Sequence, residues 1–156
     1  MSVHLEPDAA IRGQIAKDLG LESLPALTAD ISLKAWLDGA EISGRFDGVV
    51  EQICGVTLEA FRQPIGGEIE VRVVPAGSEH APIESAAGEI ELDPDAPDPP
   101  DVLEGDTIDL AAYLVEHLAL AIDPFPRKPG AVFDYEPETR EESPFAALKR
   151  LKDKEA

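Results

Sequence analysis

Apolar and polar residues alternate over residues 27–38 and predict a half-buried β-strand. Leu, Ala and Ile occupy the odd-numbered positions, and mainly Thr, Asp, Ser and Lys occupy the even-numbered ones. A period of two places these two sets on opposite faces of a strand. The pair Asp38-Gly39 ends the segment, and such a pair favours the positive backbone dihedrals of a tight hairpin turn. We therefore expect a return strand over residues 40–53.

Further strands are expected on both sides of a turn at residues 54–59. Gly44 and Gly48 in the return strand allow a bulge or the close approach of another backbone. Residues 68–73 alternate again and predict a third strand of an antiparallel meander. A short fourth strand is expected at residues 89–92, because the prolines that follow prevent it from continuing.

Two helices are predicted by caps and apolar spacing. Asp8 can cap a first helix that Gly20 ends, and its expected apolar face holds Ile11, Ile15 and Leu19. Asp109 can cap a second helix that ends before Pro124. Its expected apolar stripe consists of Leu110, Tyr113, Leu114 and Leu118. Such a stripe is what packing on a sheet requires.

These elements predict an α+β fold, either an antiparallel β-meander or a partly closed barrel, packed by two helices. Residues 1–126 would form a single domain with an acidic, proline-rich insert at 75–104. Residues 127–156 would form a flexible tail with an amphipathic helix near 143–153. That helix would begin at Ser143-Pro144 and place Phe145, Leu148 and Leu151 on one face, with Lys149 near its carboxyl end. A helix of about ten residues is marginal alone, so it must pack on the core or fold on a partner, and we favour the partner.

Charge is distributed unevenly along the chain. The net charge is −19, and between Arg72 and Arg127 the chain has 13 acidic residues and no Lys or Arg. This charge opposes extensive contact with a phosphate backbone and attracts basic partners. The acidic insert has two interpretations: a solvated loop, or a docking segment for a basic protein in which Asp93, Asp95 and Asp98 take part.

Catalytic and metal-binding motifs are not evident in the sequence. Cys54 is the only cysteine, which excludes an internal disulfide and suits a reducing compartment. A zinc site needs about four ligands, but the three histidines are scattered. No nucleotide-binding or serine-hydrolase motif occurs. The local sequence around Cys54 offers no base, so we expect a buried or half-buried structural thiol. We predict a non-enzymatic protein without metal or cofactor.

Because the chain has no signal-peptide pattern and no apolar run of about 18 residues, we expect a cytoplasmic protein that does not enter a membrane.

The order of several short segments resembles the bacterial YceD family, also catalogued as domain-of-unknown-function family 177. The segments lie at residues 53–59, 108–110, 116–124 and 143–152, so the resemblance covers about the last two thirds of the chain. Many relatives carry a Cys-x-x-Cys or Cys-x-Arg-Cys turn where this chain has Cys54. Here Thr57 stands at the second cysteine position and Val56 at the arginine position, which weakens any inherited RNA contact.

The resemblance implies a ribosome-biogenesis factor that supports 23S rRNA accumulation or processing. Combined with the charge, it favours an adaptor that binds a basic large-subunit ribosomal protein or an rRNA-processing factor, with indirect or limited contact with 23S rRNA. The residues expected to interact are Cys54, Thr57, Asp93, Asp95, Asp98, Phe145, Leu148, Lys149 and Leu151. The competing hypothesis is a small-ligand or divalent-metal-binding domain that uses the sheet interior, with the acidic loop as a lid.

Overall fold

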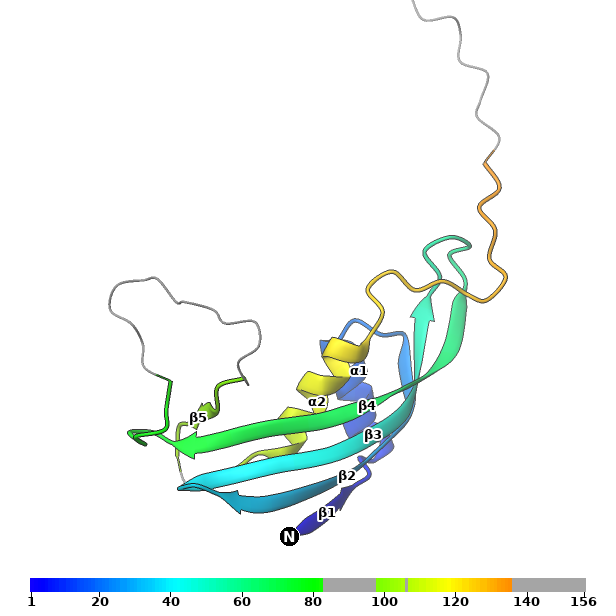
Figure 1. Cartoon of the computed structure of the whole chain (residues 1–156). Helices are drawn as coiled ribbons and strands as arrows, with labels where there is room; N and C mark the ends of the chain where they lie inside the picture. Colours follow the sequence, from blue (N-terminus) through cyan, green and yellow to red (C-terminus); the bar gives the residue numbers. More distant parts are fainter. Residues whose placement is uncertain (83–97, 106, 136–156) are drawn as a thin grey trace, which may run out of the picture.

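The computed structural model describes residues 1–82, 98–105 and 107–135, and its centre is one curved, five-stranded β-sheet (Figure 1). The strands follow the chain order: β1 (Ser2–Leu5), β2 (Ser23–Trp36), β3 (Gly39–Ile53), β4 (Ala60–Pro75) and β5 (Asp101–Leu103). The first four pair antiparallel, and β5 pairs parallel with β4. Within the described residues β1 and β5 are the sheet edges. The predicted α+β class is confirmed, and of the two predicted architectures the open meander is the observed one.

Several strand boundaries differ from the sequence prediction. β2 begins at Ser23, four residues before the predicted start at residue 27. The register with β3 shifts between Ser23 and Ala26, and Ser23 still pairs with Glu51. β4 has 16 residues instead of the six predicted. The sequence analysis did not predict β1, which pairs with the middle of β2, or β5. The strand predicted at residues 89–92 lies outside the described residues.

The hairpin turn between β2 and β3 is displaced by one residue from its predicted place. Trp36 pairs with Gly39, so Leu37 and Asp38 form the turn, and it is Leu37 that has a positive φ of 51°. Gly39 instead opens β3, where a Cβ atom would overlap the carbonyl of Val73. Close packing against β4 therefore explains this glycine better than turn geometry does.

The inward face of the sheet forms the hydrophobic core. Its fully buried side chains include Leu27, Ile31, Ile42, Phe46, Ile69 and Val73. Phe46 pairs with Gly67 across β3 and β4, and a Cβ atom on Gly67 would lie 2.9 Å from the Phe46 ring. At Gly44 a Cβ atom would overlap the carbonyl of Asp30. The predicted close approach of another backbone at Gly44 is thus confirmed.

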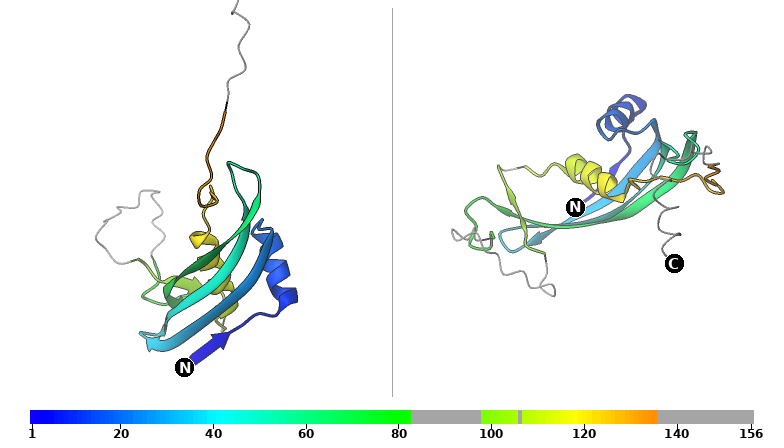
Figure 2. Two further views of the ribbon diagram at one scale, coloured as in Figure 1. Left: turned by 90° about the vertical axis from the view of Figure 1, so that its right-hand side faces the viewer. Right: turned by 90° about the horizontal axis from the view of Figure 1, so that it is seen from above.

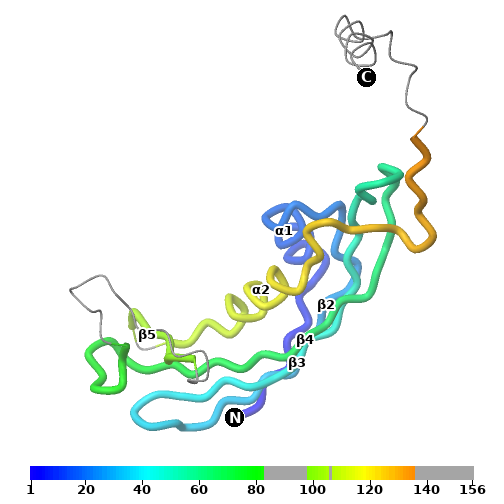
Figure 3. Tube along the Cα trace, turned by 45° about the horizontal axis from the view of Figure 1, so that its top comes forward, coloured from blue at the N-terminus to red at the C-terminus, as the bar shows by residue number. Residues whose placement is uncertain are grey.

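Two helices, α1 (Ala9–Asp18) and α2 (Leu110–Ala121), lie on the concave face of the sheet (Figures 2 and 3). Both predicted caps are present: the Asp8 carboxylate accepts the amide of Ile11 at 2.9 Å, and the Asp109 carboxylate accepts two amides at 3.0 Å. The predicted stripe of α2 is confirmed as core, with Leu114 and Leu118 buried and Leu110 and Tyr113 packed against them.

The predicted apolar face of α1 is correct only in part. Ile15 and Leu19 pack against the core, and Gly20 ends the helix with a φ of 68°. Ile11, however, is 53% exposed, and Ala16 is the buried residue of this helix. Residues spaced four apart drift around a helix of 3.6 residues per turn, so Ile11, the first residue of the predicted face, lies outside the interface.

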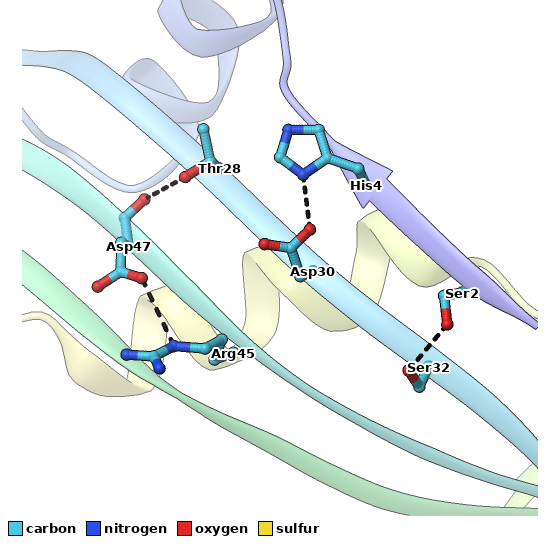
Figure 4. Close-up of polar contacts among 7 residues, drawn as sticks. All are labelled: Ser2, His4, Thr28, Asp30, Ser32, Arg45 and Asp47. Carbon is cyan, nitrogen blue, oxygen red and sulfur yellow. Dashed lines mark hydrogen bonds and ion pairs between the residues drawn. The ribbon is translucent and has the colours of Figure 1, made fainter.

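Polar side chains of β1, β2 and β3 interact with one another on the face of the sheet opposite α2 (Figure 4). The imidazole Nδ1 of His4 lies 2.7 Å from the Asp30 carboxylate, and Arg45 lies 3.7 Å from Asp47. The hydrogen bond and charge of Asp30 raise the pKa of His4. Asp30 occupies a polar position of the alternation predicted over residues 27–38. The burial of Leu27, Ala29 and Ile31 on the other face confirms that alternation.

Two leucines of α2 provide a matched test of this packing. Leu118 is fully buried, whereas Leu120 is 78% exposed. We expect Leu118→Ala to lower the free energy of unfolding by about 2–5 kcal/mol through lost burial and a cavity. Leu120→Ala should change it by less than about 0.5 kcal/mol. Urea unfolding measures both, and equal effects of the two substitutions would contradict the position of α2.

Candidate functional site

The turn between β3 and β4 buries the single cysteine of the chain. Cys54 continues the inward positions of β3 and has no exposed surface. Its amide donates to the carbonyl of Glu59 at 2.9 Å, and its carbonyl accepts the amide of Leu58 at 2.9 Å. Backbone hydrogen bonds therefore fix the turn around the thiol.

Three backbone amides point at the sulfur of Cys54. Those of Val56 and Thr57 lie 3.4 Å from Sγ, and that of Lys128 lies 3.3 Å away. Hydrogen bonding from the Thr57 side chain, followed by that from the Lys128 backbone, lowers the pKa of the Cys54 thiol from 9.0 to about 6. The donors favour the thiolate more strongly than burial disfavours it.

Residues 126–128, here called the exit strap, attach the segment after α2 to this turn. The amide of Gly55 donates to the carbonyl of Pro126 at 2.9 Å, and the Lys128 ammonium lies 2.9 Å from the Glu59 carboxylate. This contact raises the pKa of Lys128 and lowers that of Glu59. Both side chains are partly exposed, so the ion pair itself contributes little stability. The larger contribution comes from the backbone contacts around the buried sulfur.

A pair of glutamines adds a second attachment below the exit strap. Gln52 is buried at an inward position of β3. Its amide nitrogen donates to the carbonyl of Asp123 at 3.0 Å, and its oxygen accepts from Gln63 at 2.6 Å. These bonds satisfy a buried polar side chain, which would otherwise be costly. They also connect the end of α2 to the sheet.

In this arrangement Cys54 helps to hold two segments of the chain together. Its sulfur accepts hydrogen bonds from two parts of the chain that are 74 residues apart. Within the described residues, no histidine is among its hydrogen-bond partners, although a nucleophilic thiol normally works with such a base. The predicted burial of this thiol is confirmed.

An acidic hollow of about 510 Å³ lies between α2, the paired strands β3 and β4, and the residues leading into β5. Its carboxylates in the described residues are Glu41, Glu70, Asp98, Asp101 and Glu116. Arg72 and His117 also line it, and Arg72 lies 3.9 Å from Glu41 and over the ring of Trp36. Negative charge therefore predominates around this hollow.

Two side chains of α2 organise the wall of the acidic hollow. The Tyr113 hydroxyl donates to the Asp101 carboxylate at 3.2 Å, and burial followed by the charge of Asp101 raises the pKa of Tyr113 to about 12. The Nδ1 atom of His117 lies 2.9 Å from the carbonyl of Tyr113. Because a carbonyl can only accept, Nδ1 of His117 carries a proton.

The structure brings together some of the residues predicted to interact. Cys54 and Thr57 share the turn, and Asp98 lines the acidic hollow. The turn and the hollow lie at opposite ends of the sheet, since Ile53 pairs with Ala60 and Asp101 with Val73. The other predicted residues, Asp93, Asp95, Phe145, Leu148, Lys149 and Leu151, lie outside the described residues.

The sequence analysis missed the exit strap and the wall of the acidic hollow. Gln52 offered one signal, because it is a polar residue at an inward position of an otherwise apolar alternation. Lys128 and Tyr113 gave no comparable signal. Their partners, Glu59 and Asp101, are brought close only by tertiary packing.

A family model described as "Large ribosomal RNA subunit accumulation protein YceD" matches residues 42–152. The match covers well over half of the chain, so the chain belongs to the YceD family, and the predicted resemblance is confirmed. The matched region contains the Cys54 turn and the acidic hollow. No curated protein and no solved structure matches the chain.

Two further findings concern only the described part of the chain. No group of three His, Cys, Asp or Glu side chains is arranged there to hold a metal ion. None of its helices is both long and apolar enough to cross a bilayer.

The surroundings of Cys54 predict a measurable titration. In the folded protein the ultraviolet absorbance of the thiolate should rise with a midpoint near pH 6, and in the unfolded chain near the ordinary value of 9.0. The lowered pKa stabilises the fold fully above pH 9, and this contribution disappears as the pH falls through about 6. Thr57→Val should raise the folded-state midpoint, because it removes the first of the causes. A midpoint that is the same in the folded and unfolded protein would contradict the hydrogen-bonded thiolate.

Proposed function

We propose that this member of the YceD family supports the accumulation of large-subunit ribosomal RNA as a non-enzymatic adaptor. Its partner would be a basic large-subunit ribosomal protein or rRNA-processing factor, and contact with 23S rRNA would be indirect or limited. The family match supports the role in ribosomal RNA accumulation. We place this activity in the cytoplasm.

The acidic hollow is the observation that carries the adaptor proposal. Five acidic residues line it together with Arg72 and His117, in a chain with a net charge of −19. A Lys or Arg side chain entering the hollow would gain several favourable charge interactions in a partly desolvated place. An RNA strand approaching the same surface would be repelled. The hollow is therefore suited to a basic protein segment.

Leu120 gives the same surface an apolar contact point. It lines the hollow and is 78% exposed, although the other three leucines of the same helix pack on the core. Protein interfaces combine a desolvated apolar centre with a polar rim. An exposed leucine among acidic residues fits a partner segment with alternating basic and apolar residues.

The alternative function is binding of a small ligand or divalent metal in the same hollow. Its volume of about 510 Å³ falls within the usual range of ligand pockets. Large, saturable thermal stabilisation by added Ca²⁺ or Mg²⁺ would favour this alternative.

A charge-matched pull-down tests the adaptor proposal. One variant carries Glu70→Gln, Asp98→Asn and Glu116→Gln, and the control carries Glu6→Gln, Asp18→Asn and Asp134→Asn, none of which lines the hollow. Both change the net charge from −19 to about −16. At about 0.5–1 kcal/mol for each lost charge contact, the hollow variant should bind the partner about 10- to 100-fold more weakly.

The readout is mass spectrometry of large-subunit proteins and processing factors recovered with the full chain from native extract. The control variant should recover them as the unmodified chain does. Equal losses in both variants would show that only net charge matters. Recovery of no such protein by the unmodified chain would contradict the adaptor proposal.

A further inference from the structure

A second hollow, at the other end of the sheet, has the opposite charge. It has a volume of about 510 Å³ and lies beside α1, at the starts of β2 and β4. Arg12, Lys17 and Arg62 line it, which are three of the eight Lys and Arg residues in the described part of the chain. We call it the basic hollow. Such a concentration is notable because acidic residues outnumber basic ones by 32 to 13.

Arg12 is held in place by groups that do not neutralise it. Its Nη1 donates to the carbonyl of Pro7 at 2.6 Å, and its Nε donates to the carbonyl of Leu24 at 3.1 Å. These bonds use two of the five N–H groups of the guanidinium. Within the described residues no carboxylate lies within the 4.0 Å of an ion pair with Arg12. A half-buried cation is therefore oriented, with donors still available.

The other two cations are less constrained. Arg62 lies 3.3 Å from Glu51 through its Nε atom, and 64% of its side chain is exposed. Lys17 is exposed in the last turn of α1. Both can move toward an anion in the hollow without breaking the core. Glu22 is the one carboxylate among the lining residues, and it would disfavour an extended polyanion.

We propose that the basic hollow binds a single phosphate group. Guanidinium groups match phosphate oxygens with paired hydrogen bonds, and an ammonium adds a mobile point charge. Three cations, offset by Glu22 in the lining and by Glu51 beside Arg62, leave a small net positive charge. This charge suits one phosphate better than a longer polyanion. A phosphodiester of an RNA strand and free phosphate share this chemistry. The proposal goes beyond the adaptor function, because the basic hollow is a separate site from the acidic one. Arg62 lines the basic hollow and Arg72 lines the acidic hollow, ten positions further along β4.

NMR titration of the full chain with two separate probes tests this proposal. The probes are inorganic phosphate and a short single-stranded RNA oligonucleotide, both at low salt and neutral pH. Lys17→Gln combined with Arg62→Gln is the test variant. Lys34→Gln combined with Arg45→Gln is the control. It also removes one arginine with a carboxylate partner and one lysine that has no ion pair among the described residues. The single Lys17→Gln variant alters only an exposed residue and serves if the double variant fails to fold.

The expected result is saturable shifts of the Gly13, Lys17 and Ser23 amides, with about tenfold weaker binding in the test variant and little change in the control. Shifts with phosphate alone would identify a small phosphorylated ligand. Shifts with RNA, and a salt slope of about −0.7, would identify one phosphate of a strand. Both outcomes support the site. Absence of saturable shifts with either probe, or equal weakening in the control, would overturn it.

Discussion

The antiparallel pairing of β3 with β4 determines where the other features of this molecule lie. It runs without interruption from Ala40 and Val73 at one end to Ile53 and Ala60 at the other. Along it, Ile42, Phe46 and Val50 face the helices. A slip of one residue would turn this set to solvent. The same register brings Cys54 to one end of the sheet and places Val73 beside β5 at the other, so both candidate surfaces depend on it.

The two ends of this pairing carry different chemistry. At one end the exit strap and the hydrogen bonds to Cys54 attach the chain after α2 to the sheet, and the basic hollow lies nearby on α1. At the other end, acidic residues of β3, β4, β5 and α2, together with Asp98, line the acidic hollow. The net charge of −19 does not show that acidic and basic surfaces lie at different ends of the sheet. One surface is suited to a basic partner, and a smaller one on the same sheet is suited to an anion.

The sequence predicted correctly those elements whose formation depends on residues close together in the chain. The alternation in β2, the caps Asp8 and Asp109, and the apolar stripe of α2 were all correct. The short edge strands β1 and β5 were missed, because they carry little pattern of their own and exist through pairing with β2 and β4. The length of β4 was underestimated, since Pro64, Gly66 and Gly67 interrupt its alternation. Of the residues predicted to interact, Cys54, Thr57 and Asp98 lie in the two regions described above, and their role in binding stays a prediction. The basic hollow was not predicted, because it is formed by residues far apart in sequence.

The central claim is that the acidic hollow contacts a basic protein of large-subunit assembly. Site-specific photo-crosslinking in cells tests it most directly, with the photoreactive residue at Leu120 in the hollow and, for comparison, at Ile11 on α1. Both side chains are exposed, so both variants should fold. The account predicts crosslinks from position 120, but not from position 11, to a basic large-subunit protein or processing factor. Crosslinks only to RNA or to unrelated acidic proteins, or the same products from both positions, would contradict it.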